Sequence, residues 1–162
     1  MTGETNLQLR EDDLESTEVR ALVARHLRGM AENSPPDACF AFDTGQLKQP
    51  GLTFWTAWHG RALAGMAALK TLDRHNGEIK SMRVADAFLG TGIGRAMLLH
   101  VIGIARERKL DRLWLETGSS LAFVPALRLY EREGFGYCGP FGDYADNPFS
   151  RFMTLTLAAP RG

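Results

Sequence analysis

The sequence predicts an α/β (α+β) fold in which a mixed, mostly antiparallel sheet of six to seven strands is flanked by about four helices. Short runs that alternate apolar and polar residues indicate strands, and longer runs with apolar residues at helical spacing indicate helices. Along the chain these runs follow the order β-α-α-β-β-β-α-β-α-β-β. Three successive strands favour a meander, and the later strand–helix–strand unit favours a crossover into the same sheet.

The first part of the chain predicts an edge strand followed by helices. Residues 5–11 (TNLQLRE) show a short alternation, with Leu7 and Leu9 on one face. From Ser16, a candidate cap, apolar residues recur at helical spacing. The double proline at positions 35 and 36 ends this helix, and residues 37–47 are predicted to form a short second helix.

The rest of the chain predicts a meander, two helices and three further strands. A hairpin that turns at His59-Gly60 leads to a third strand, and a glycine-rich turn then opens a helix. The last predicted helix ends at Gly134. The expected strands are 52–58, 63–72, 78–84, 111–117, 135–141 and 150–158, and the expected helices are 92–109 and 125–133.

Length and composition indicate one domain over residues 1–162. Apolar residues make up 44% and charged residues 23% of the chain, and 19 basic residues balance 19 acidic ones. A neutral chain gives no indication of nucleic acid or a membrane as a partner, so neither is expected. The N-terminal residues lack a signal-peptide pattern, and no apolar run approaches the roughly 18 residues of a membrane span. We therefore expect a cytoplasmic protein.

No metal site is expected from the cysteines and histidines. Cys39 and Cys138 have no zinc-type spacing with each other or with the four histidines, so each is expected to be a buried free thiol. His26 lies on the apolar face of the first predicted helix, and we expect a core histidine whose hydrogen bonds are satisfied. The three tryptophans occur in strand patterns and are expected in the core.

The stretch FLGTGIGRAML places Gly90, Gly92 and Gly94 directly before a predicted helix. Glycine destabilises a helix, so three of them indicate that the exposed backbone has a use. Free N–H groups and the positive end of the helix dipole bind anions such as phosphate. A P-loop is excluded because Arg95 and Ala96 follow Gly94. A dinucleotide fingerprint is disfavoured because three strands precede the turn. A turn that serves packing alone stays an alternative.

Residues 78–135 resemble the GNAT superfamily of N-acyltransferases, which use acyl-coenzyme A. The segment EIKSMRVADAFLGTGIGRAMLLHVIGIARERKLDRLWLET contains the glycine turn, and an Ala-x-x-x-Tyr-x-x-x-Gly-Phe pattern follows at Ala126, Tyr130, Gly134 and Phe135. The order of the remaining elements also fits, so the resemblance covers nearly the whole chain. It implies a GNAT-like fold and acetyl-coenzyme A (acetyl-CoA) as the co-substrate.

The resemblance also implies where the coenzyme binds. In that family the turn reads Gln/Arg-x-x-Gly-x-Gly/Ala, and its backbone amides bind the coenzyme A pyrophosphate. Leu89 stands where Gln or Arg is usual, which leaves Arg95 as the nearest cation. The main chain before the turn, splayed from the next strand by a bulge, binds the pantetheine amides and polarises the acetyl carbonyl in that family. The implied cofactor-binding residues are Met82, Arg83, Val84, Leu89, Gly90, Thr91, Gly92, Ile93, Gly94, Arg95 and Ala126.

Acetyl transfer to an amine requires a base and an acid. A free alkyl amine has a pKa of about 10.4, so it must lose a proton near neutral pH. The resemblance implies that Glu78 is the general base through water, and Glu116 is the second candidate. Tyr130 occupies the family position of the general acid that protonates the leaving thiolate. A solvated carboxylate at Glu78 and a packing role for Tyr130 stay open.

The acceptor pocket is expected between residues 33–42 and 141–152. Phe40, Phe141, Tyr144 and Phe149 are candidates for an aromatic wall, and Lys80, Arg83 and Arg151 for holding a carboxylate on the substrate. Strict alternation along 78–84 predicts Glu78, Lys80 and Met82 on one face and Ile79, Ser81 and Arg83 on the other.

The sequence thus predicts an N-acetyltransferase that transfers acetyl from acetyl-CoA to a primary amine of a small molecule, by direct attack in a ternary complex. A GNAT-like module that binds acyl-CoA without turnover is the alternative, because Leu89 removes a polar side chain from the turn. Exposed sheet edges are compatible with a homodimer.

Overall fold

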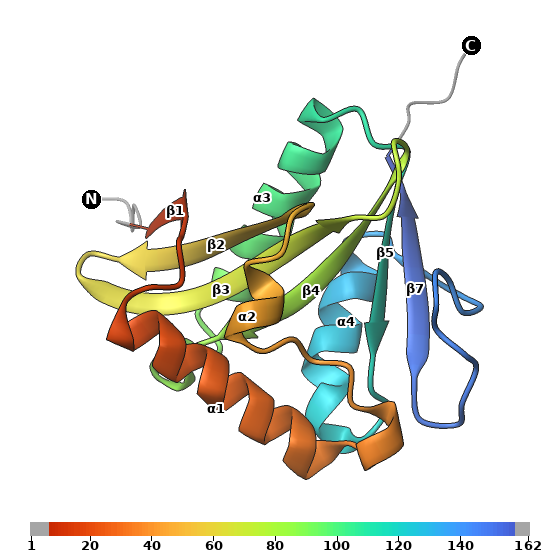
Figure 1. Ribbon diagram of the computed structural model, residues 1–162, viewed down its shortest axis with the longest axis horizontal. Helices are drawn as coiled ribbons and strands as arrows, with labels where there is room; N and C mark the ends of the chain where they lie inside the picture. Colours follow the sequence, from red (N-terminus) through yellow and green to blue (C-terminus); the bar gives the residue numbers. More distant parts are fainter. Residues whose placement is uncertain (1–6, 158–162) are drawn as a thin grey trace.

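Seven strands form one open sheet in the order β1-β2-β3-β4-β5-β7-β6 in a computed structural model, which describes residues 7–157 (Figure 1). Neighbouring strands are antiparallel except for the parallel pair β4 and β5. The strands are β1 (Leu7–Glu11), β2 (Leu52–His59), β3 (Ala62–Thr71), β4 (Asn76–Val84), β5 (Arg112–Thr117), β6 (Gly136–Cys138) and β7 (Arg151–Thr156). The predicted class and strand number are confirmed.

Two helices cover each face of the sheet. The helices α1 (Thr17–Asn33) and α2 (Thr44–Leu47) lie on one face, and α3 (Ile93–Glu107) and α4 (Val124–Arg132) lie on the other (Figure 1). Ser16 caps α1, since its side chain accepts a hydrogen bond from the N–H of Val19. No helix within residues 7–157 has the length and apolar character needed to cross a membrane.

The predicted helix over residues 37–47 is wrong. The structure has a 3-10 turn at Pro36–Ala38 and the single-turn helix α2, with extended chain between them. Asp43 starts α2 with a capping box: its side chain accepts a hydrogen bond from the Gln46 N–H, and the Gln46 side chain accepts one from the backbone N–H of Asp43. The extended residues between the two turns carry Phe40 and Phe42 over the sheet.

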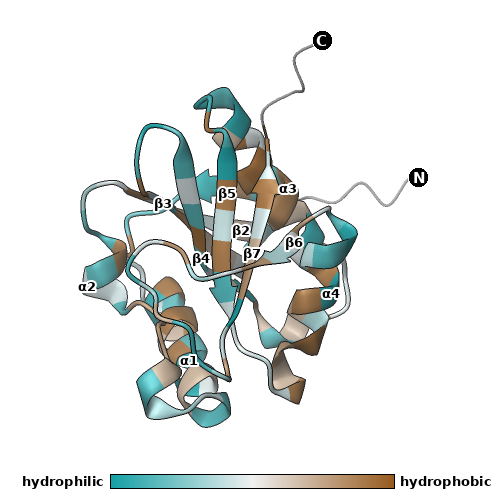
Figure 2. Cartoon of the chain, turned by 90° about the vertical axis from the view of Figure 1, so that its right-hand side faces the viewer, coloured by the Kyte–Doolittle hydropathy of each residue, from teal (hydrophilic) through white to brown (hydrophobic). Residues whose placement is uncertain are grey.

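A separate hydrophobic layer lies on each face of the sheet. On the side of α3 and α4, apolar residues of five strands pack with both helices; on the side of α1 and α2, a smaller layer forms around Phe54, Trp58 and Met66. Figure 2 shows hydrophilic residues on the outer surfaces of the helices and hydrophobic ones towards the sheet. Of the tryptophans, Trp55 and Trp58 are buried as expected, whereas Trp114 is only partly buried.

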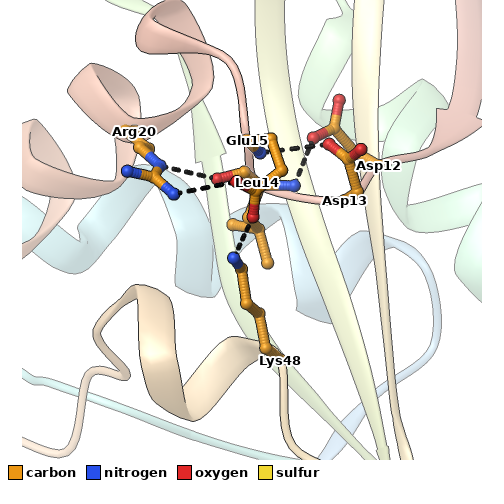
Figure 3. A network of polar contacts seen from close by, with 6 residues as sticks. All are labelled: Asp12, Asp13, Leu14, Glu15, Arg20 and Lys48. Atoms are coloured by element: carbon orange, nitrogen blue, oxygen red, sulfur yellow. Dashed lines mark hydrogen bonds and ion pairs between the residues drawn. The ribbon is translucent and has the colours of Figure 1, made fainter.

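The connection from β1 to α1 is fixed by polar contacts around Leu14 (Figure 3). The carboxylates of Asp12 and Asp13 accept hydrogen bonds from the N–H groups two residues further on, at 2.8 and 3.0 Å, as in Asx turns. Arg20 donates to the Leu14 carbonyl at 2.8 Å, and Lys48 of the α2 region pairs with Glu15. Leu14 itself has a φ of +63° and is buried beneath α1 and α2. These contacts anchor the start of α1.

A β-bulge interrupts β4 at Ser81. Lys80 pairs with Ala68 of β3, whereas Arg83 pairs with Met66, so Ser81 and Met82 together occupy the place opposite one residue. Ser81 has a φ of +53°, which is uncommon for a residue with a side chain. The bulge shifts the alternation of every residue that follows it in the strand.

The predicted faces of β4 are therefore wrong beyond Lys80. Met82 packs in the layer on the side of α3 and α4, together with Ile79, whereas Arg83 lies against α1. Glu78, Lys80 and Arg83 are thus successive side chains on the face covered by α1 and α2. Strict alternation fails because the extra residue at the bulge changes the phase of the strand by one.

The strands β4 and β5 pair over only three residues of each and then separate. Their register begins at Asn76 and Arg112 and ends at Glu78 and Trp114. Figure 1 shows the two strands diverging towards the end at which the α1 helix crosses the sheet. Lys80 and Glu116, two residues beyond the last pair, therefore lie on either side of the opening between the strands.

Candidate functional site

The glycine turn presents bare backbone at the start of α3. Gly90 and Gly92 have φ angles of +76° and +85°, a region that favours glycine, and Gly92 is the N-cap of α3 without a side-chain cap. The N–H groups of the first helical turn have no intrahelical partner, so they are available to an anion at the positive end of the helix. At Gly94 a Cβ would make ordinary van der Waals contacts with Val84 and Leu129, at 3.4 and 3.5 Å.

The side chains around this turn add little positive charge to it. Leu89 is 64% exposed and has no polar group to offer. Arg95 was expected to be the nearest cation, but its Nε lies 3.0 Å from Oε2 of Glu133, just beyond the end of α4. Thr91 donates its hydroxyl to the carbonyl of Phe88. An anion at this turn would therefore be held mainly by backbone N–H groups.

Glu78 and Lys80 form a buried ion pair with the hydroxyl of Tyr144 beside it. The exposed fraction is 3% for Glu78 and 9% for Lys80, so the carboxylate is not a solvated strand end. Tyr144 donates to Oε2 of Glu78 at 2.5 Å, and Nζ of Lys80 lies 3.4 Å from the same oxygen and 2.9 Å from the Tyr144 oxygen. Burial lowers the pKa of Lys80, and burial together with the charge of Glu78 raises the pKa of Tyr144.

Glu116 provides a second carboxylate on the same side of the sheet. Its Oε2 accepts a hydrogen bond from the hydroxyl of Ser150 at 2.8 Å. Burial raises the pKa of Glu116, an effect opposed by that hydrogen bond and by the charge of Lys80. A carboxylate with a raised pKa is a stronger base than an exposed one. Both predicted candidates for the base thus lie next to Lys80.

Aromatic rings cover this polar cluster. The ring of Tyr144 lies 5.2 Å from that of Phe40 and 5.0 Å from that of Phe141, measured between centroids. Phe149, by contrast, packs on Phe123, so only three of the four predicted wall residues come together. The sequence reasoning missed two residues that contact the cluster, namely Phe152, beside Tyr144, and Phe42, over which Lys80 lies.

Tyr130 lies on the other side of the sheet, in α4. Its side chain is buried, and its hydroxyl lies 3.9 Å from the sulfur of Met82, next to the bulge. Burial raises the pKa of Tyr130 to about 12, so the phenol stays protonated at neutral pH. The ring also packs edge-on against Phe135, so it has the predicted packing role as well. The hydroxyl of Ser81, at the bulge, is buried without a hydrogen-bond partner.

His26 is buried in α1 as expected, but its hydrogen bonds are not satisfied. Its Nδ1 has no hydrogen-bond partner although the residue is only 7% exposed. Burial, with a contribution from the positive charge of Arg83, lowers the pKa of His26 to about 4. Most buried polar side-chain atoms in proteins have a hydrogen-bond partner, so Nδ1 of His26 is an exception.

The lowered pKa of His26 predicts a loss of stability in mild acid. Between about pH 6.5 and pH 4 the unfolded chain binds a proton at this histidine that the folded chain does not, so stability falls as the pH falls. We expect the free energy of unfolding to drop by about 2 kcal/mol at this site between pH 7 and pH 5. Urea unfolding of the His26→Gln variant should show a drop smaller by that amount. A His59→Gln variant, changed at an exposed turn, controls for loss of a histidine, and an unchanged drop in His26→Gln would contradict the assignment.

Within residues 7–157, no three His, Cys, Asp or Glu side chains are grouped to hold a metal ion. The arrangement instead offers a glycine turn at a helix start, the buried carboxylate of Glu78, the partly buried carboxylate of Glu116 and the buried phenol of Tyr130. A helix start whose first N–H groups have no intrahelical partner can bind an anion, and the bulge interrupts the regular pairing of β4 between this turn and Glu78. These are the groups that acyl transfer to an amine requires.

Comparison with known sequences identifies acetyltransferases as relatives of this chain. Residues 12–135 match the model of the Acetyltransferase (GNAT) family. An uncharacterized N-acetyltransferase of Escherichia coli (strain K12), YedL, is 46% identical over 92% of this chain and 94% of its own length. An IAA acetyltransferase of Azospirillum brasilense is 32% identical over 91% of this chain and 95% of its own length.

Solved structures show the same fold. A crystal structure of a GNAT family acetyltransferase from Elizabethkingia anophelis with acetyl-CoA bound superimposes with a TM-score of 0.61. The alignment covers 94% of this chain and 99% of that one, at 19% sequence identity. At this identity the likeness extends to the fold and not to the substrate.

Proposed function

Because this chain belongs to the Acetyltransferase (GNAT) family, we propose that it transfers the acetyl group of acetyl-CoA to a primary amine of a small molecule. The family uses acetyl-CoA, and the Elizabethkingia anophelis protein of this fold has it bound. The observation that carries the proposal is Glu78, a buried carboxylate held by Tyr144 and Lys80 on the strand that leads into the glycine turn. A buried carboxylate on this strand is in a position to accept the proton of an amine bound beside it.

Glu78 is proposed as the general base. Its Oε2 is occupied by Tyr144 and Lys80, so Oε1 is the oxygen that accepts a proton from the acceptor ammonium, directly or through water. Lys80 pairs with this carboxylate, and the pairing offsets part of the cost of burying both groups. Glu116, on the far side of the opening between β4 and β5, would hold the ammonium of the acceptor by charge. This is attack in a ternary complex, without a covalent enzyme intermediate.

The coenzyme is proposed to lie along the main chain that precedes α3. The N–H groups at the start of α3 would bind the pyrophosphate, and the backbone of residues 82–84 would bind the pantetheine arm. Bound acetyl-CoA supplies the activated acetyl group. The bulge at Ser81 frees backbone donors from the sheet, and such donors can stabilise the oxyanion that develops on the acetyl carbonyl.

Tyr130 is proposed as the acid that protonates the leaving thiolate. The raised pKa keeps its proton in place until the thiolate forms, although it also makes the phenol a weaker acid. We expect Tyr130→Phe to lower kcat roughly 10- to 100-fold with little change in the KM for acetyl-CoA. Thiol release measures both constants. Tyr137→Phe removes an exposed hydroxyl from β6 and is the matched control. An unchanged kcat in Tyr130→Phe would leave the tyrosine as a packing residue.

A small-molecule acceptor is supported by the aromatic cover over Glu78 and by the relative from Azospirillum brasilense, which is named for acetylating IAA. Thiol release from acetyl-CoA, measured with a panel of small amines, tests the proposal directly. We expect turnover with at least one amine, and first-order dependence on both substrates. Tight binding of acetyl-CoA without turnover on any amine would instead favour a module that binds acyl-CoA.

A further inference from the structure

Two arginines from different elements meet beside α1. A Cβ atom placed on Gly29, in α1, would lie 2.9 Å from Nη1 of Arg83 and 3.1 Å from Nη1 of Arg25. Both guanidinium groups therefore border the same small space next to the helix, and glycine keeps that space open. The bulge takes up Ser81 as an extra residue, and with it in place the side chain of Arg83 points towards α1.

The positive charge at this place is only partly balanced. Asp86 is the one carboxylate within ion-pair distance of either arginine among the described residues, at 3.1 Å from Nε of Arg25 and 3.9 Å from Nη2 of Arg83. Asp86 is itself exposed, whereas Arg83 is largely covered. Burial and then the charge of Arg25 lower the pKa of Arg83, and the charge of Asp86 opposes this shift. A carboxylate between the two guanidinium groups would reduce their mutual repulsion.

A buried polar atom without a partner lies next to the arginines. His26 precedes Gly29 by one helical turn on the same side of α1, and its Nδ1 makes no hydrogen bond although the residue is more than nine-tenths buried. Burial and then the charge of Arg83 lower the pKa of His26, and the Arg83 guanidinium lies against Gly29, one turn further along α1. A neutral imidazole beside two guanidinium groups can donate a hydrogen bond to an anion.

The other cations predicted to hold a substrate carboxylate are engaged elsewhere. Lys80 is committed to Glu78 and Tyr144. Arg151 is exposed and donates to the carbonyls of Pro148 and Ser150, in its own loop. Arg83 remains, and it follows Glu78 and Lys80 on the same face of β4, at a spacing of roughly 7 Å for each position.

We propose that Arg83, Arg25 and His26 form a binding site for a carboxylate group of the acceptor, so that the acceptor is an amino acid or a related amine with an anionic group. The inference rests on the proposed acetyl transfer. An acceptor that presents its amine to Glu78 would extend along β4 and place its carboxylate between the two guanidinium groups, where bidentate hydrogen bonds are available.

Matched pairs of amines with and without a carboxylate test this site. Suitable pairs are phenylalanine with phenethylamine, tryptophan with tryptamine, and 4-aminobutyrate with butylamine. We expect the wild-type chain to prefer the carboxylate-bearing member of at least one pair by 10-fold or more in kcat/KM, mainly through KM. In Arg83→Met, which keeps the backbone and the apolar stem, this preference should fall to less than 2-fold. Arg28→Met removes an exposed cation from the same helix and should keep the wild-type preference.

A second variant tests the geometry without removal of charge. In Gly29→Ala the new methyl group would displace the arginine tips, so the KM for the carboxylate-bearing acceptor should rise several-fold. The KM for its uncharged partner and for acetyl-CoA should stay unchanged. Because alanine favours a helix more than glycine does, this variant is expected to fold. A KM that rises equally for both amines would overturn the proposal.

Different results would reject the carboxylate site and the proposed acetyl transfer. Equal use of both members of every pair by the wild type would overturn the carboxylate site and leave acetyl transfer in place. Stimulation of phenethylamine turnover by free acetate, absent in Arg83→Met, would show that the site takes a carboxylate and would support the proposal. If no amine is acetylated, the proposed function fails, and calorimetric titration with phenylalanine, tryptophan and 4-aminobutyrate decides the site. Binding of one of them that weakens at least 10-fold in Arg83→Met supports the site, and any other result rejects it.

Discussion

Replacement of Glu78 by glutamine is expected to lower kcat by roughly 10²- to 10⁴-fold, the range of a lost general base. Glutamine keeps the size of the side chain and can still accept a hydrogen bond from Tyr144, but it cannot take up the proton of the acceptor. The KM for acetyl-CoA should change little. Thiol release under saturating acetyl-CoA measures the effect.

The comparison with Glu116→Gln decides which carboxylate is the base. Glu116 lies on the same face and has a raised pKa, so it is the direct competitor. We expect Glu116→Gln to raise the KM for the amine with a smaller loss of kcat. The reverse pattern, with the larger loss of kcat at Glu116, would transfer the role of base to that residue. Glu78→Gln also leaves Lys80 as a buried cation without its partner, so a loss of about 3 kcal/mol or more in unfolding free energy is expected and should be measured alongside.

Gly92→Glu is expected to raise the KM for acetyl-CoA by roughly 100-fold or more. The backbone of Gly92 has a φ of +85°, which costs about 1–2 kcal/mol for a residue with a side chain. A carboxylate at the start of α3 would in addition repel the pyrophosphate and compete for the same N–H groups. Steady-state kinetics with varied acetyl-CoA, at a fixed amine concentration, measures the change.

Gly51→Glu is the matched control for this substitution. Gly51 has a φ of +83°, and, as at Gly92, a Cβ there would meet nothing within 4 Å. It lies in the turn before β2, so the control carries the same conformational cost and the same added charge without contact with the turn before α3. If both variants bind acetyl-CoA equally well, the glycine turn is not a pyrophosphate cradle.

Most of the helices and strands are predictable from short stretches of sequence. An element that buries one face repeats its apolar residues with the period of a helix or a strand. The alternation around Leu52 to Trp58, for example, predicts a strand that the structure extends by one residue, to His59. Residues 37–47 do not form the one predicted helix, because Asp43 within them caps the start of a separate helical turn, α2. Capping competes with helix continuation over a few residues, and the sequence does not show which one dominates.

The candidate site was predictable in its residue types and only partly in its contacts. The glycine turn, Glu78 and Tyr130 stand where their motifs predict. The partner of Glu78 and Lys80 is Tyr144, more than sixty residues further along the chain, and such a contact depends on the path of the loop between β6 and β7. The side of β4 on which Arg83 lies depends on one extra residue in pairing with β3, which is a property of two strands together.

The bulge at Ser81 has a conformational cost that the packing of the sheet does not explain. A strand with one residue fewer at this point would alternate regularly and would still turn Met82 towards α4 and Arg83 towards α1. The interior therefore does not require the extra residue, although its left-handed backbone carries a cost of order 1–3 kcal/mol and leaves a hydroxyl unpaired. Because packing does not require this residue and its backbone is strained, we expect the bulge to serve the proposed contact between the main chain and acetyl-CoA.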